Sequence, residues 1–284
     1  MIGAYEITLM TSVGIAVVFA LSLNLISGFC GQISLGHAAF LGIGAYTSIL
    51  MGQAGYPLAV GALTGAVIAA AVGFVVGLTS LRVRHDFLAI TTMGVGFLFV
   101  GVVRQQDWLG GEMGLTGQPM ASADKPVFLL VVLAIAAAIT LFSLYLKRTW
   151  MGFAFDAIAD DEDTARVVGI DVARFKLVAF AIGTGLAGIA GALYAKHIPF
   201  IGPDSFGFVE SVTVLAMVVI GGIGSVPGVI MAAVLLTLLP QWFQFIDEYK
   251  LLVYGGLLFA VMRFAPGGLA SMPGMLKRKS ERAS

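Results

Sequence analysis

The stretch ITLMTSVGIAVVFALSLNLI, residues Ile7–Ile26, decides the fold class, since it runs for 20 residues without a charge. An α-helix needs about 20 apolar residues to cross the hydrocarbon core of a bilayer. No basic residue precedes this run, whereas a cleaved secretory signal usually has a basic start and an apolar core of roughly 7–15 residues. We therefore expect a retained membrane helix near the beginning of the chain.

Further apolar regions of similar length follow along the whole chain. They are Ile33–Met51, Leu58–Leu81, Phe87–Val103, Val127–Leu146, Phe175–Ala195, Val209–Ile220 together with Ile230–Phe243, and Leu251–Phe264. The glycine-rich segment Gly221–Gly228 interrupts the penultimate region, which should form two short helices or one span with a re-entrant piece. The pattern predicts an all-α integral membrane protein, a polytopic bundle of about 8–9 transmembrane segments with Gly-rich broken helices, in a single domain of residues 1–284.

The composition supports immersion in lipid. Hydrophobic residues make up 59% of the chain and charged residues only 11%, against roughly 25% charged in soluble domains. So little charge cannot coat a water-exposed surface of this size. The formal net charge of zero gives no reason to expect nucleic acid as a partner, and a single cysteine, Cys30, excludes an internal disulfide framework.

Basic residues set the expected orientation. Most Lys and Arg residues fall on one side if Arg82 and Arg84, the loop at about 147–176 and the tail at about 265–284 share that side. Because cytoplasmic loops are enriched in Lys and Arg, this side should be the cytoplasm. The N-terminus is then expected outside and the C-terminus inside.

The loop at about 147–176 should contain a short helix beside the membrane. Asp160 is expected to cap it, because aspartate is favoured at that position and negative charge in the first turn complements the helix dipole. The helix should end at a glycine. Its acidic and small apolar residues could fit a groove on a partner or lie on lipid headgroups, and the anionic inner leaflet argues against the second alternative. The residues concerned are Asp156, Asp160, Asp161, Glu162, Asp163, Ala165, Val168 and Gly169.

Several motifs of catalysis and energy coupling are absent from the sequence. There is no G-x-x-x-x-G-K-[ST] phosphate loop, so ATP would have to be hydrolysed on another chain. There is no G-x-S-x-G or H-E-x-x-H motif, and His37, His85 and His197 lie too far apart in sequence to suggest a metal site. We expect no catalytic residue, metal or cofactor on this chain. Spans nearly free of charge weaken an ion-coupled carrier or channel, which stays open as an alternative.

Two glycine-rich breaks lie in the two halves of the chain. Paired interrupted helices often mark a substrate route in transporters, although such glycines also serve helix packing alone. The residues are Gly36, Gly42 and Gly44 in the first half and Gly221, Gly222 and Gly224 in the second.

Neutral polar residues within the spans are the candidates for lining a substrate path. They suit a zwitterionic or neutral polar solute, but they could equally bond to the backbone of their own helix or, for the histidine, to a neighbouring helix. The candidates are Asn24, Gln32, Ser34, His37, Tyr46, Thr91, Thr92, Ser211 and Thr213.

Five stretches together resemble the permeases of branched-chain amino-acid ABC transporters, specifically the LivM-like branch. They are SLGHAAFLGIGAY (Ser34–Tyr46), LGGEMGLTG (Leu109–Gly117), GIDVARFKLVAFAIGTGLAGIAGALYA (Gly169–Ala195), GGIGSVPG (Gly221–Gly228) and APGGL (Ala265–Leu269). The resemblance covers nearly the whole chain. Many relatives carry one more N-terminal helix, which this sequence does not contain.

The resemblance implies a permease subunit of an ATP-driven importer in the bacterial inner membrane. The implied partners are a second permease subunit, two cytoplasmic ATPase subunits that bind ATP and Mg, and an extracytoplasmic solute-binding protein. Asp156–Gly169 falls where the family contacts its ATPase, although Phe153, Asp156 and Ala159 stand where basic residues are usual. The implied substrates are branched-chain or other hydrophobic amino acids, with urea or short amides as the alternative.

Overall fold

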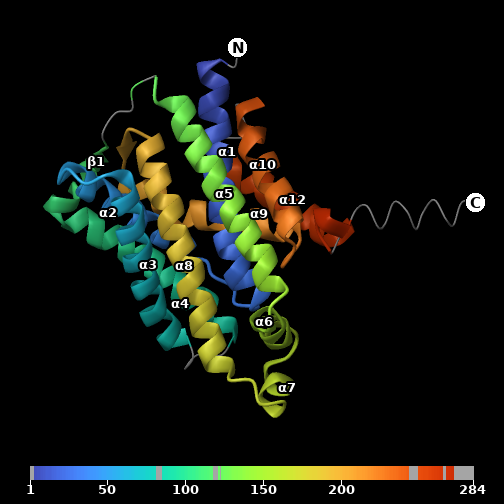
Figure 1. Cartoon of the computed structure of the whole chain (residues 1–284). Helices are drawn as coiled ribbons and strands as arrows, with labels where there is room; N and C mark the ends of the chain where they lie inside the picture. Colours follow the sequence, from blue (N-terminus) through green and yellow to red (C-terminus); the bar gives the residue numbers. More distant parts are fainter. Residues whose placement is uncertain are drawn as a thin grey trace, which may run out of the picture.

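The structure, a computed structural model, describes residues 3–80, 85–117, 121, 123–242, 249–264 and 267–271. Within them the chain is almost entirely helical, which confirms the predicted fold class (Figure 1). The helices are α1 Ala4–Leu23, α2 His37–Gln53, α3 Leu58–Ser80, α4 His85–Gln105, α5 Lys125–Lys147, α6 Trp150–Asp160, α7 Glu162–Val167, α8 Val172–His197, α9 Phe208–Gly221, α10 Val226–Trp242 and α12 Lys250–Phe264.

Short elements complete the fold. A π-helical turn, η1, extends α1 over Asn24–Phe29, and 3₁₀ turns occupy Asp107–Leu109 (η2), Gly111–Met113 (η3), Pro203–Phe206 (η4) and Leu269–Ser271 (η5). Strands β1 (Leu115–Thr116) and β2 (Phe200–Ile201) pair antiparallel. Arg82, Arg84 and most of the predicted tail lie outside the described residues.

Six helical segments are long and apolar enough to cross a membrane: Ala4–Phe29, Leu58–Thr79, Leu88–Gln105, Lys125–Lys147, Val172–His197 and Pro203–Gly221. Two shorter apolar helices, Val226–Gln241 and Leu252–Arg263, add to these within the described residues. The count of eight or nine spans stays a prediction. The break at Gly221–Gly228 separates two helices, α9 and α10, which is one of the two expected outcomes.

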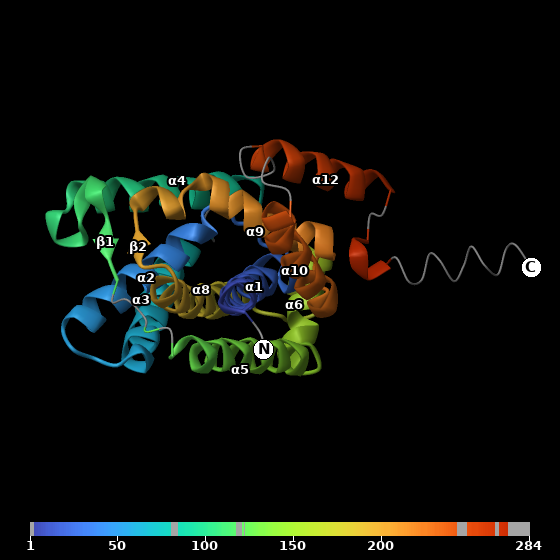
Figure 2. The same ribbon diagram turned by 90° about the horizontal axis from the view of Figure 1, so that it is seen from above.

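Helix α1 forms the centre of the bundle. It contacts α5, α8, α9 and α10, and the view along its axis shows these helices around it (Figure 2). By contrast α3, α4 and α5 expose large apolar side chains such as Leu63, Leu98 and Leu130. Apolar side chains on the outside of a bundle are the expected surface toward lipid.

Glycine allows α2, α3 and α8 to pack backbone to backbone. A Cβ on Gly44 would overlap the carbonyl oxygen of Gly188, and one on Gly191 would overlap that of Leu41. The same holds for Gly36 against the carbonyl of Thr92, while Gly42 faces the ring of Phe99. These glycines therefore serve close helix packing, as small residues do in membrane bundles.

The second span begins later than the sequence suggested. Residues Gly31–Gly36 are not helical, and Gly31 has φ +69°, so α2 starts at His37 rather than Ile33. Two side chains from other helices satisfy backbone N–H groups there: Thr92 Oγ1 accepts from Leu35 N at 3.0 Å, and Ser211 Oγ accepts from Ala38 N at 3.1 Å. The first N–H groups of a helix have no partner within it, so Ser211 caps α2, whereas Thr92 fixes the backbone just before the helix.

The loop at about 147–176 holds two helices at one end of the molecule, α6 and α7, rather than the single one expected (Figure 1). The predicted cap at Asp160 is wrong by one residue. Asp160 ends α6, and Asp161 caps α7 by accepting from Thr164 N at 2.6 Å. The predicted stop at Gly169 is confirmed, since Gly169 lies beyond the end of α7 with φ +88°.

Candidate functional site

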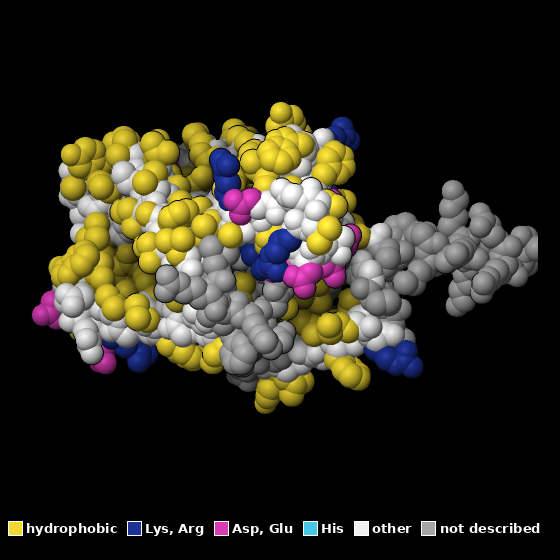
Figure 3. Space-filling view, turned by 90° about the horizontal axis from the view of Figure 1, so that it is seen from below, with side chains coloured by type: hydrophobic (Ala, Val, Ile, Leu, Met, Phe, Trp, Pro, Cys, Tyr) yellow, Lys and Arg dark blue, Asp and Glu magenta, His cyan; other side chains and the backbone are white. Residues whose placement is uncertain are grey.

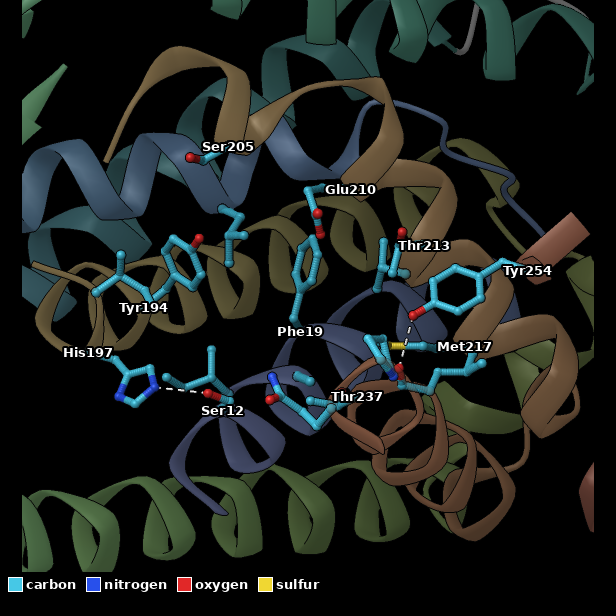
Figure 4. A pocket seen from close by; sticks show the side chains of 18 of the residues that line it. Ser12, Phe19, Tyr194, His197, Ser205, Glu210, Thr213, Met217, Thr237 and Tyr254 are labelled. Carbon is cyan, nitrogen blue, oxygen red and sulfur yellow. Dashed lines mark hydrogen bonds between the residues drawn. The ribbon is translucent and has the colours of Figure 1, made fainter. Parts of the chain in front are cut away.

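A cavity of about 720 Å³ opens among α1, α8, α9, α10 and α12, near the end of the molecule opposite α6 and α7 (Figure 4). Ligand pockets commonly measure about 300–1,000 Å³. The cavity is lined by Tyr5, Ser12, Ile15, Ala16, Phe19, Leu41, Tyr194, His197, Ile198, Ser205, Glu210, Thr213, Val214, Met217, Leu236, Thr237, Pro240, Gln241 and Tyr254.

The polar groups of the cavity sit on different walls. Glu210, in the first turn of α9, lies away from the pair formed by Ser12 and His197, and Phe19 lies between them in Figure 4. Ser12 Oγ and His197 Nε2 are 2.9 Å apart. His197 also lines a small adjoining cavity together with Lys125, whose positive charge acts on the imidazole ring. One wall therefore carries an acid and the other carries neutral hydrogen-bonding groups, with the cation of Lys125 in the adjoining cavity behind His197.

A proline shapes the wall formed by α10. Pro240 lies inside this helix and has no N–H to donate to the carbonyl of Leu236, four residues earlier. The hydroxyl of Tyr254 donates to that carbonyl instead, at 2.9 Å. The bond ties α12 to α10 at the cavity and satisfies a backbone group that the proline would otherwise leave unpaired.

Of the nine predicted path residues, only Thr213 lies on the cavity wall, and its hydroxyl donates to Val209 O within its own helix at 2.9 Å. Thr92 and Ser211 bond to the backbone at the start of α2, as described above. His37 is buried, with Nε2 2.8 Å from Ser22 Oγ, and its ring stacks on Phe19 at 5.4 Å, so it supports the wall from behind.

The remaining predicted path residues lie elsewhere in the bundle. Asn24 Oδ1 accepts from Gly224 N at 3.0 Å, which joins η1 to the break between α9 and α10. Gln32 donates to the backbone carbonyl of Lys176 at 3.1 Å. Ser34 and Tyr46 are buried, and Thr91 is half-buried on α4. A path role for these residues stays a prediction.

The sequence reasoning missed most of the polar wall. Glu210 and His197 fall at the predicted ends of spans, where a charge or a polar ring can reach the membrane interface without a special role. An acid in the first turn of an otherwise apolar helix was the available signal. Tyr194, Thr237 and Gln241 carried no such signal, because single residues of these types are common in helices.

The end of the molecule that carries α6 and α7 is charged, and Figure 3 shows acidic and basic side chains gathered there among apolar ones. Trp150 and Phe153 expose 70% and 66% of their area, while Phe155 and Ile158 on the opposite face of α6 are buried. Helix α6 is therefore anchored on one side and presents an apolar surface on the other.

The predicted coupling residues cover both faces of this end. Ala165 is buried. Glu162 is half-buried and forms ion pairs with Lys176 and Arg166. The others, Asp156, Asp160, Asp161, Asp163, Val168 and Gly169, are exposed. Partial desolvation of its carboxylate raises the pKa of Asp156, an effect that the charge of Lys147 opposes. Hydrogen bonding to the backbone and side chain of Thr164 lowers the pKa of Asp161.

The two short helices are joined to the end of α1. Lys147 Nζ lies 5.5 Å from the centre of the Phe29 ring, and a Cβ on Gly31 would lie 3.2 Å from Ala159 Cα. A displacement of α6 would therefore be felt by η1 and, through Asn24, by the break between α9 and α10. Among the described residues, no three His, Cys, Asp or Glu side chains form a group that could hold a metal ion.

Comparison with known proteins gives a consistent result. The family described as branched-chain amino acid transport system / permease component matches residues 6–262. The chain is 34% identical to the high-affinity branched-chain amino acid transport system permease protein LivM of Salmonella typhimurium, over 99% of this chain and 73% of the relative. It is 33% identical to LivM of Escherichia coli K12, over 95% and 70%, and 26% identical to LivH of the same organism, over 89% and 90%. No solved structure matches.

Proposed function

The chain belongs to the branched-chain amino acid transport system permease family, and from this premise we propose that it imports branched-chain or other hydrophobic amino acids by alternating access. It is a multi-pass inner-membrane permease subunit, not an enzyme. Its relatives named LivM and LivH are both permease proteins, which supports pairing with a second, different permease chain.

Two ATPase subunits, which bind ATP and Mg, drive the alternating-access cycle of the permease pair. One of them docks on α6 and α7 of this chain. The observation that carries this proposal is the exposed surface of these helices, where Trp150 and Phe153 stand beside four exposed aspartates. An apolar anchor ringed by charge suits a protein groove. The contact of Ala159 on α6 with Gly31, and that of Lys147 at the end of α5 with Phe29, supply a route into the bundle.

The α6–α7 end faces the cytoplasm and the start of α1 faces outward, where a solute-binding protein delivers substrate. Lys147, Arg148, Arg166, Arg174 and Lys176 gather at the α6–α7 end, as expected for the inner side.

The orientation is tested by labelling with a membrane-impermeant maleimide in a Cys30→Ser background. Val167→Cys, at a position 87% exposed at the end of α7, should react only when the cytoplasmic side is open. Met113→Cys, 85% exposed at the opposite end, is the matched control and should react only from outside. The reverse pattern would refute the docking proposal, because the ATPases could not reach α6 and α7.

The energy source is tested by leucine uptake into vesicles that contain the complete set of subunits. Uptake should require ATP and persist after the proton gradient is dissipated. The control replaces the phosphate-loop lysine of the ATPase subunits and should abolish uptake. Transport that survives loss of ATP but stops with the gradient would instead identify an ion-coupled carrier.

A further inference from the structure

We propose that the cavity is an amino-acid site in which Glu210 binds the substrate ammonium and the wall of Ser12 and His197, with the charge of Lys125 behind it, receives its carboxylate. The inference rests on the proposed function and narrows it, since a site of this kind selects zwitterionic amino acids over urea and short amides.

The first observation is the position of Glu210. It lies within a segment long and apolar enough to span a membrane, and Figure 4 shows its carboxylate directed into the cavity toward Phe19. Carboxylates are costly at such positions and usually serve a function there. In surroundings of low polarity, attraction to an ammonium group is much stronger than in water.

The second observation is the positive charge of Lys125 behind the cavity wall that lies across from Glu210. Lys125 is half-buried at the start of α5 and lines the small adjoining pocket. The His197 ring lines both this pocket and the cavity. Ser12 and His197 add hydrogen-bonding groups on the cavity side. A zwitterion carries a matching pair of charges, whereas urea and amides carry none. The arrangement therefore favours one orientation of an α-amino acid.

The third observation is the apolar part of the cavity lining. Phe19, Leu41, Met217 and Leu236 line the cavity there. Burial of an aliphatic side chain against such a surface is favourable, at about 0.8 kcal/mol for each CH₂ group. The cavity thus combines two charged ends with a region for an apolar side chain.

Glu210 also lies where a negative charge favours the dipole of α9. A purely structural role would change stability but not the choice among ligands. The experiment therefore measures selectivity. Tritiated leucine is bound to the assembled transporter in nanodiscs without its solute-binding protein, and competitors are added: 4-methylpentanoate, which lacks the ammonium, leucinamide, which lacks the carboxylate, and urea.

For the unaltered protein, leucine should compete at least tenfold better than 4-methylpentanoate, a ratio consistent with one charge-assisted hydrogen bond. Glu210→Gln should weaken leucine binding about tenfold and bring the two ligands close together, and Glu210→Asp should retain part of the preference. Lys125→Met should instead reduce the preference for leucine over leucinamide. Glu112→Gln and Lys196→Met, which make the same changes outside the cavity, should leave both ratios unchanged.

Equal competition by leucine and 4-methylpentanoate in the unaltered protein would overturn the inference, and this arm needs no variant to fold. Unchanged ratios in Glu210→Gln would do the same, as would displacement of leucine by urea. Each of these results is compatible with ATP-dependent leucine uptake when the solute-binding protein is present. Loss of that uptake is a separate result and would overturn the proposed function itself.

Discussion

Replacing Tyr254 by phenylalanine removes the hydroxyl that donates to the Leu236 carbonyl, to which Pro240 cannot donate an N–H. Tyr254 and Leu236 are 2% and 0% exposed, so the bond lies in a buried part of the bundle. A buried polar group left without a partner costs about 1–3 kcal/mol, although interhelical bonds in membranes average nearer 0.6 kcal/mol. We expect Tyr254→Phe to lower the free energy of unfolding by about 1–2 kcal/mol.

A double-mutant cycle isolates the cause. Pro240→Ala restores a backbone N–H that can donate to Leu236 O, so Tyr254→Phe should cost about 0.5 kcal/mol or less in that background. Reversible unfolding of the purified chain in mixed micelles measures all four variants, and the coupling energy should be about 1 kcal/mol. A loss from Tyr254→Phe that is equal in both backgrounds would refute the reasoning, because the hydroxyl would then not be compensating for the proline.

Other substitutions test the packing and the short helices. Gly191→Ala places a methyl group on the backbone of α2 and should destabilise the chain by about 1–3 kcal/mol in the same assay, whereas Gly101→Ala, which meets open space, should not. Asp161→Ala should increase hydrogen–deuterium exchange across α7, whereas Asp160→Ala should not; equal effects would contradict the cap. Lys176→Met removes the cation that ties α7 to α8 and should reduce ATP-driven uptake without changing leucine binding; unchanged uptake would show that this ion pair plays no part in coupling.

The membrane bundle could be predicted because its signal is local. A run of about 20 uncharged residues implies a helix wherever it occurs, and a glycine such as Gly169 ends a helix by its own backbone conformation. The cap of α7 was misplaced because Trp150–Asp160 forms a helix of its own, which uses Asp160 as its last residue. Four acids in a row leave the sequence with several equivalent caps.

The cavity could not be predicted, because it depends on how helices distant in sequence are rotated toward one another. Hydropathy gives the depth of Glu210 and His197 in the membrane but not the direction in which they face. Thr92 and Ser211 illustrate the same limit. Their hydroxyls were expected on a path or on their own helix. That of Thr92 does bond to Ala89 O within α4, but both also accept from backbone N–H groups at the start of α2.

The hydrogen bonds that Thr92 and Ser211 accept at the start of α2 have a consequence for biosynthesis. The backbone N–H groups of Leu35 and Ala38 donate to hydroxyls that are synthesised 57 and 173 residues later in the chain. A nascent chain that ends before α9 therefore holds an exposed amide at the beginning of α2, where hydrocarbon offers no substitute. The first turn of this early helix is completed only after Ser211 of the 284 residues has been synthesised, so a product truncated before that residue would keep an unpaired amide there.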